Sequence, residues 1–98
     1  MKPSAVVPAL EEALRQLGVR VRRARGAFRG GLCVVDGEPV VVVNRQHPDE
    51  AQVAVLATAL REHGGADGLY LRPAVRAALE DAWAQVDAGQ SAEVGDDD

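Results

Sequence analysis

The fold is decided by residues 32–44, which read LCVVDGEPVVVVN. Two apolar runs flank Asp36-Gly37, and Asp-Gly between such runs is a strong signal for a two-residue type I′ turn, in which both turn residues take positive φ. This turn sets the pairs Val35 with Glu38 and Cys33 with Val40. The stretch is therefore predicted to form a β-hairpin of fixed register.

Both faces of this hairpin are apolar. Successive side chains of a strand point to opposite faces. One face carries Cys33, Val40 and Val42, and the other carries Leu32, Val41 and Val43. A hairpin with one wet face normally alternates apolar and polar residues. We therefore expect both faces to be covered, by helices of this chain or by a second copy.

A further strand is expected upstream of the hairpin. Val19 and Val21 alternate with Arg20 and Arg22, which is the period of a half-exposed strand. The glycine-containing segment 26–31 then interrupts it. Three consecutive strands joined in this way predict an antiparallel meander.

Helical periodicity brackets the strands. A first helix is predicted over about 8–17, with Pro8 at its first position and Gly18 in its C-terminal cap. The remaining predicted elements are a core helix over 48–63 with His47 at its cap, a short strand at 69–71 and a C-terminal helix over 73–88. These elements place the chain in the α+β class.

Length and composition indicate one small domain. The 98 residues, 47% of them apolar, suffice for one modest core. From Gly89 onward the chain is rich in Gly, Ser and acid, which predicts a disordered acidic tail over 89–98 behind a domain at 1–88. The four acids of that tail account for the net charge of −4.

No feature of the sequence indicates membranes or secretion. No apolar run approaches the roughly 20 residues that a membrane-spanning helix needs, and the N-terminus has no signal-peptide pattern. The single cysteine excludes an internal disulfide framework. We expect a cytoplasmic protein that does not engage a membrane.

The stretch 31–63 resembles the core of the ImmA/IrrE-type zinc metallopeptidases. In that family a strand ending in Asn precedes a helix that reads Leu-Ala-His-Glu-Leu-Gly-His, and with Asn44 on that Asn this chain reads LATALRE. The two metal-binding positions hold Thr58 and Glu62, and the general-base position holds Ala59. A zincin needs two imidazoles and an activating carboxylate, so the resemblance implies a peptidase-like scaffold without catalysis. The overall layout is also similar to that of a group of small bacterial proteins, from which no activity carries over.

The remaining chemistry-bearing residues do not assemble a catalytic or metal site. His47 and His63 lie at opposite ends of the predicted core helix, ~24 Å apart at 1.5 Å per residue, too far to share a metal ion. Cys33 lies within an apolar strand and is interpreted as a core residue. The glycines of 26–31 lead into a strand, unlike a phosphate-binding loop. We expect no enzyme and no cofactor, and a small enzyme with an unrecognised site is one alternative.

Arginines cluster in the Arg20–Arg29 stripe, with no acid among them. They could contact the phosphates of a nucleic acid, with Arg20, Arg22 and Arg25 as candidates. Charged side chains also protect a strand edge from unwanted pairing, and neither a helix-turn-helix nor stacking aromatics accompany these arginines. Weak nucleic-acid binding is therefore an alternative and not the leading hypothesis.

The leading hypothesis is a non-catalytic protein-interaction or scaffold module. The doubly apolar hairpin offers Cys33, Val40 and Val42 as interaction residues, and Trp83 on the last helix is a candidate aromatic anchor. Either the last helix seals the second face of the hairpin or a second copy does. We favour the second copy and expect a homodimer, with a different protein partner as the other possibility.

Overall fold

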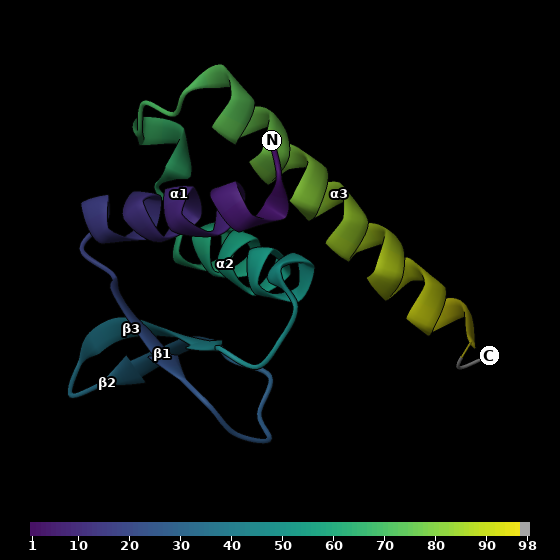
Figure 1. Ribbon diagram of the computed structural model, residues 1–98, viewed down its shortest axis with the longest axis horizontal. Helices are drawn as coiled ribbons and strands as arrows, with labels where there is room; N and C mark the ends of the chain where they lie inside the picture. Colours follow the sequence, from purple (N-terminus) through teal and green to yellow (C-terminus); the bar gives the residue numbers. More distant parts are fainter. Residues whose placement is uncertain (97–98) are drawn as a thin grey trace.

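A computed structural model describes the backbone of residues 1–96 and the side chains of residues 1–89. In this part of the chain, three α-helices and one 3₁₀ turn accompany a three-stranded mixed sheet. The elements are α1 (Pro3–Gln16), β1 (Arg20–Ala24), β2 (Gly31–Val35), β3 (Glu38–Asn44), α2 (Asp49–His63), η1 (Ala66–Gly68) and α3 (Pro73–Asp96). Figure 1 shows α1 and α2 above the sheet and α3 on their far side. The predicted α+β class is confirmed.

The hairpin forms with the predicted register. β2 and β3 pair antiparallel, and the aligned pairs include Val35 with Glu38 and Cys33 with Val40. Asp36 and Gly37 have φ values of 52° and 82°, the positive values that a type I′ turn requires. Local turn chemistry therefore aligns these two strands.

The predicted antiparallel meander is wrong. β1 lies parallel to β3, with Arg20 opposite Val40, and the strand order is β1-β3-β2. β3 is apolar from Val40 to Val43 and can be buried on both faces, so it takes the centre of the sheet. The alternating β1 suits an edge. The connection 25–30 consequently crosses the end of β3 to reach the opposite edge.

Asn44, the last residue of β3, holds this crossing connection. It is 1% exposed, and its Nδ2 donates hydrogen bonds to the carbonyl oxygens of Gly26 and Phe28 at 2.8 and 2.6 Å. Gly30 has a φ of +90°, and a Cβ added there would lie 2.5 Å from the Val42 carbonyl oxygen. Only glycine fits where the connection passes against β3.

The core lies between one face of the sheet and the helices. Its fully buried large apolar side chains are Leu10, Leu14, Val19, Val41, Val43, Leu56, Leu60 and Leu79. α3 packs mainly on α2 and α1. Among the described residues, helices therefore cover only the face that carries Val41 and Val43, and coverage of the other face by a second copy stays a prediction.

The parallel pairing of β1 with β3 determines which side chains lie on the sheet face that no helix covers. Because β1 runs beside β3, Arg20 and Arg22 lie next to Val40 and Val42 on the side away from the helices. A face that the hairpin alone would make apolar is thereby bordered by charged side chains, and Val40 is only 3% exposed without any contact to the core cluster.

The first helix begins earlier than predicted. α1 starts at Pro3, which takes the early helical position expected of Pro8, and Pro8 lies inside the helix. An internal proline removes one backbone hydrogen bond, but Val6 and Val7 are buried beside it and their packing favours the extra turn. Gly18 has the expected positive φ, at 83°.

The second half of the chain holds two further differences. The predicted strand at 69–71 is absent from the described structure, where Leu69 and Leu71 instead pack against the hydrophobic core. Pro48, not His47, is the N-cap of α2, and no side chain caps that end.

α3 extends past the predicted boundary at Ala88, and its helical backbone reaches Asp96. The last two residues of the predicted acidic tail lie outside the described residues, and disorder over 89–98 stays a prediction.

Candidate functional site

The outer edge of β2 carries adjacent exposed side chains of apolar character. β2 pairs with β3 on one side only, and its five residues carry no charge. Cys33 is exposed, Val34 is 72% exposed and Val35 is 48% exposed. Three consecutive side chains with apolar character thus stand at an open strand edge, an arrangement that natural proteins usually avoid.

The opposite edge of the sheet, β1, is charged. Arg20 and Arg22 are exposed on the face away from the helices. Arg23 points to the helical side, where its Nε and Nη2 donate to the carboxylate of Glu11 at 2.9 and 2.6 Å. These hydrogen bonds raise the pKa of Arg23, against the opposing effect of burial. β1 is therefore fixed to α1 and blocked by charge.

The predicted interaction residues divide between two places. Cys33, Val40 and Val42 do share one face, as the register predicts. Cys33 is exposed, so its interpretation as a core residue is wrong. Val42 is half-buried and Val40 is buried, so that face offers less apolar surface than its sequence indicates. Trp83 lies on α3 and is not part of this face.

Trp83 joins two helices of the same chain. It is half-buried, and its Nε1 donates to the Ala57 carbonyl oxygen of α2 at 2.7 Å. The Arg61 guanidinium lies 5.3 Å from the ring centroid, within cation–π range. Arg61 also pairs with Asp87 of α3 at 2.8 Å. The anchor role predicted for Trp83 is therefore occupied by the α2–α3 contact.

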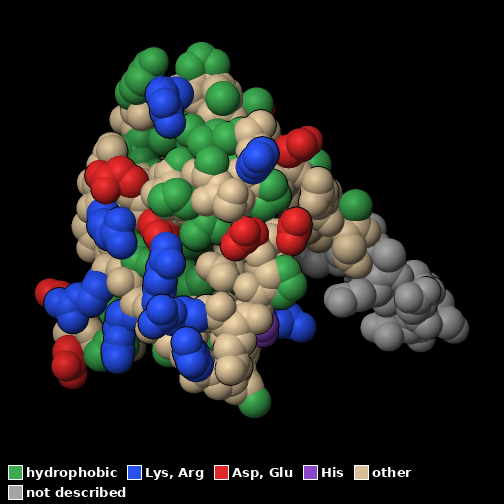
Figure 2. Space-filling model, viewed as in Figure 1, with side chains coloured by type: hydrophobic (Ala, Val, Ile, Leu, Met, Phe, Trp, Pro, Cys, Tyr) green, Lys and Arg blue, Asp and Glu red, His purple; other side chains and the backbone are tan. Residues whose placement is uncertain are grey.

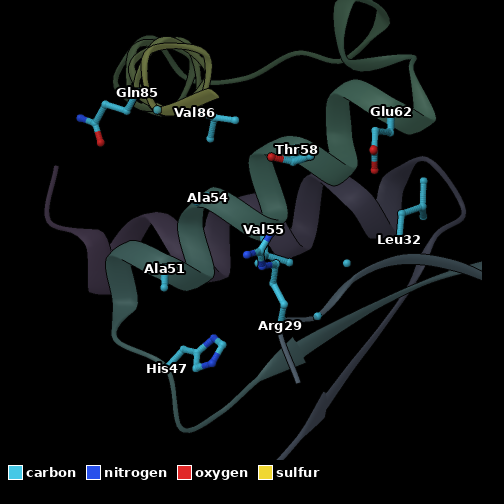
Figure 3. Close-up of a pocket in the computed structure, with 13 residues that line it drawn as sticks. Arg29, Leu32, His47, Ala51, Ala54, Val55, Thr58, Glu62, Gln85 and Val86 are labelled. Atoms are coloured by element: carbon cyan, nitrogen blue, oxygen red, sulfur yellow. The ribbon is translucent and has the colours of Figure 1, made fainter. Parts of the chain in front are cut away.

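A groove of about 650 Å³ adjoins the β2 edge. Its walls come from the start of β2, from α2 and from α3, and Figure 3 shows Thr58 and Glu62 of α2 along it. Arg29 rises from the segment before β2 toward Val55. The lining alternates small apolar side chains with a few polar ones, as binding grooves commonly do.

The groove contains two of the three positions aligned with the zincin residues. Thr58 and Glu62 line it, whereas Ala59 is 1% exposed and belongs to the core. His47 lies at the far end of the groove, and His63 is exposed at the other end of α2. Within the described residues, no cluster of His, Cys, Asp and Glu could hold a metal ion.

The candidate phosphate-contacting arginines lie at the sheet end of the molecule. Arg20 and Arg22 share the face away from the helices, and Arg25 is exposed in the connection that leaves β1. Figure 2 shows Lys and Arg side chains gathering over the sheet, below the helices. Pairing of Arg23 with Glu11 removes one member of the stripe from that surface.

Sequence reasoning missed Val34, Val35 and Asn44. The hairpin register places the two valines next to the turn, where a strand projects beyond the helices that cover its middle, and this geometry was available as a signal. Asn44 was visible as the polar end of VVVVN. Its role depends on the crossing connection, which no local pattern indicates.

No family model, curated protein or solved structure matches this chain. Among the described residues, no helix is both long enough and apolar enough to span a membrane.

Proposed function

We propose that this chain is a non-catalytic protein-interaction module and that the outer edge of β2 is its binding surface. The observation that carries the proposal is the exposure of Cys33, Val34 and Val35 on an uncharged edge strand. Such an edge presents unpaired backbone N–H and C=O groups to any extended segment. Addition of a strand to an open edge is a recurrent mode of protein recognition.

The groove supports this role because it supplies side-chain contacts next to the backbone edge. Leu32 of β2 and Val55 and Thr58 of α2 line it. In strand addition the backbone hydrogen bonds provide affinity, and pockets for alternate side chains provide specificity. An edge beside a groove combines the two.

The residues at the zincin-like positions support binding without hydrolysis. Thr58 and Glu62 place no imidazole at the two metal-binding positions, and Ala59 places no carboxylate at the base position, so the zincin arrangement of ligands and base is missing even though His47 and Glu62 line the groove. A peptidase-like origin of the scaffold remains part of this proposal.

The proposal is tested by placing a charge on the β2 edge. Full-length chain carrying Val34→Lys is compared with Tyr70→Lys, since Tyr70 is a second exposed apolar residue, 82% exposed and far along the chain. Each variant is immobilised, and the proteins captured from an extract of the native cell, the chain itself included, are quantified by mass spectrometry.

We expect Val34→Lys to lose a captured protein by roughly tenfold or more, equivalent to about 1.4 kcal/mol, and Tyr70→Lys to retain it. Equal capture by both variants, with both shown to be folded by circular dichroism, would contradict the role of the β2 edge.

A second candidate function is weak nucleic-acid binding. The observation that favours it is the gathering of Arg20, Arg22 and Arg25 at the sheet end of the molecule, away from the helices. Such a surface attracts phosphates without reading sequence. It lies on the opposite side of β3 from the β2 edge, so the two functions can be tested by separate substitutions.

A further inference from the structure

The β2 edge has a symmetry that indicates its occupant. Resting on the proposed function, we propose that the strand added to β2 is β2 of a second copy, paired antiparallel about a twofold axis through Cys33. The result is a continuous six-stranded sheet, with the helices of both copies on the same side.

Strand length sets the register of this pairing. β2 comprises five residues, Gly31–Val35, and Cys33 is the middle one. Two antiparallel copies overlap along their whole length only when Cys33 lies opposite Cys33 of the other copy. In that register Leu32 of each copy lies opposite Val34 of the other.

The backbone groups of β2 fit the same register. The pair that closes a two-residue turn, Val35 with Glu38, exchanges its hydrogen bonds across the hairpin, and hydrogen-bonded and non-hydrogen-bonded pairs alternate from there. Pro39, which lacks an N–H, accordingly lies at a non-bonded position opposite Val34. Leu32 and Val34 are thus the residues whose N–H and C=O groups point outward, and the proposed register pairs these two with each other.

The proposed pairing would bury the exposed Val34 side chain against the second copy. Leu32 and Val34 point to the helical side of the sheet, because Leu32 lies opposite the buried Val41 and the two residues are one period apart. Val34 is 72% exposed in one chain. Opposite Leu32 of a second copy, which lines that copy's groove on the side of Glu62 (Figure 3), it lies at the mouth of the groove.

Side chains of opposite charge also meet across the proposed twofold axis. The turn residue Asp36 of one copy comes opposite the Arg29-Gly30 segment of the other, because positions opposite each other continue outward from Cys33. Arg29 and Asp36 are both exposed, and the twofold axis creates this contact twice. The β1 edge offers no such match, since Arg20 and Arg22 would face arginines.

Disulfide formation between the two Cys33 residues can test the proposed register. In the proposed pairing the two Cys33 residues form a non-hydrogen-bonded pair, for which Cα atoms lie about 4.5 Å apart, within the range that a disulfide spans. Added diamide takes up the two electrons and two protons released when the two thiols join as a disulfide, and is reduced to the corresponding hydrazine. The disulfide is a probe of proximity and not part of the proposed function.

The experiment measures mass and cross-linking of the full chain. Sedimentation equilibrium at micromolar concentrations under reducing conditions is expected to give twice the mass of the chain, and Val34→Lys is expected to give a folded monomer. Tyr70→Lys serves as the matched control and should remain a dimer. Diamide should convert the native chain to a covalent dimer through Cys33.

A double variant fixes the register. In Cys33→Ser with Val34→Cys, the new thiols lie opposite Leu32 of the other copy and not opposite each other, so diamide should leave this dimer uncross-linked. Efficient cross-linking of this variant, or a dimer that survives Val34→Lys, overturns the proposed pairing.

The outcomes also separate this inference from the function on which it rests. A native chain that stays monomeric at all concentrations, while Val34→Lys still loses a different captured protein, overturns self-pairing and leaves the interaction module standing. A monomeric chain for which Val34→Lys changes no capture overturns both.

Discussion

The two edges of the sheet are built in opposite ways. β2 is uncharged, antiparallel to its neighbour and joined to it by a two-residue turn. β1 is rich in arginine, parallel to the same neighbour and separated from it along the chain by the whole of β2. One edge is therefore positioned by local geometry and left open, whereas the other is positioned by distant contacts and blocked.

Under the proposed function, this difference would let one small sheet bind a partner through one edge and avoid aggregation through the other. An open edge is a hazard unless it has a dedicated partner, so a chain with a single binding edge needs the other one closed. On β1, Arg20 and Arg22 provide the closing charges, and the pairing of Arg23 with Glu11 holds the strand against α1. The arginines thus have a structural role whether or not they also contact phosphates.

The largest effect is expected where the chain passes from one edge to the other. Asn44→Ala removes the donors that satisfy the carbonyl oxygens of Gly26 and Phe28 at a part-buried site. Each such loss costs roughly 1–3 kcal/mol, so we expect about 3 kcal/mol of lost stability and a melting temperature lower by about 15 °C.

Gln46→Ala is the control for this substitution, because its backbone N–H donates to the Asn44 Oδ1 and its own side chain is exposed. Scanning calorimetry should show little change for Gln46→Ala. A shift of similar size in both variants would mean that the crossing connection does not depend on the Asn44 amide.

A smaller effect is expected at the anchor of β1. Arg23→Ala leaves the Glu11 carboxylate, whose side chain is only 3% exposed, without its partner. Breaking a buried pair costs roughly 3–5 kcal/mol. We expect about 2 kcal/mol in urea unfolding because the Arg23 side chain is 48% exposed and water can replace part of the contact.

The matched control is Arg22→Ala on the open face, for which we expect almost no change. The pKa of Arg23 is raised in the folded chain, so its contribution is fully present below the unfolded pKa and would be lost only as the pH rises through the folded value. The difference between the two variants should therefore stay constant between neutral and mildly alkaline pH. Equal losses in both variants would refute the anchoring role of Arg23.

The same contrast explains which parts of the fold could be predicted. The register of β2 on β3 depends on Asp36 and Gly37, which tolerate the positive φ of a two-residue turn, and it was predicted residue by residue. The partner of β1 depends on which strand can be buried on both faces and on a connection held by Asn44, and neither is encoded within β1 itself. The parallel pairing was therefore missed.

In the candidate site, too, local features could be predicted and features set by non-local contacts could not. The shared face of Cys33, Val40 and Val42 follows from strand alternation and was predictable, but the shielding of Val40 follows from the non-local neighbours that β1 supplies. Trp83 was chosen as an interaction anchor from residue type alone, and that role stays a prediction. Its partner, the Ala57 carbonyl oxygen, is set by how α3 crosses α2 and could not be read from either helix.

A more modest effect is expected in the turn that fixes the open edge. Gly37→Ala forces a side chain into a φ of 82°, and no atom within 4 Å obstructs the added Cβ. The loss should therefore be conformational only, about 1 kcal/mol in chemical denaturation. Gly37→Asn should recover part of it, because Asn tolerates positive φ better than Ala. A loss equal to that of Asn44→Ala would show that the turn carries more of the fold than local geometry implies.

The smallest effect on the fold is expected from removing the charges of β1. Arg20→Gln with Arg22→Gln alters two exposed side chains, and the one ion pair involved, Arg20 with Glu38 at 4.0 Å, is itself exposed. Such pairs contribute roughly 0–1 kcal/mol, so the melting temperature should change by only a few degrees.

Binding of the native chain to duplex DNA at physiological salt should be no tighter than tens of micromolar, roughly the range of non-specific contacts. Fluorescence anisotropy over a salt series measures this. A submicromolar complex that weakens steeply with salt and is lost in the double variant would make nucleic-acid binding the function of the charged edge, whereas weak binding that both chains share leaves the arginines with the closing role described above.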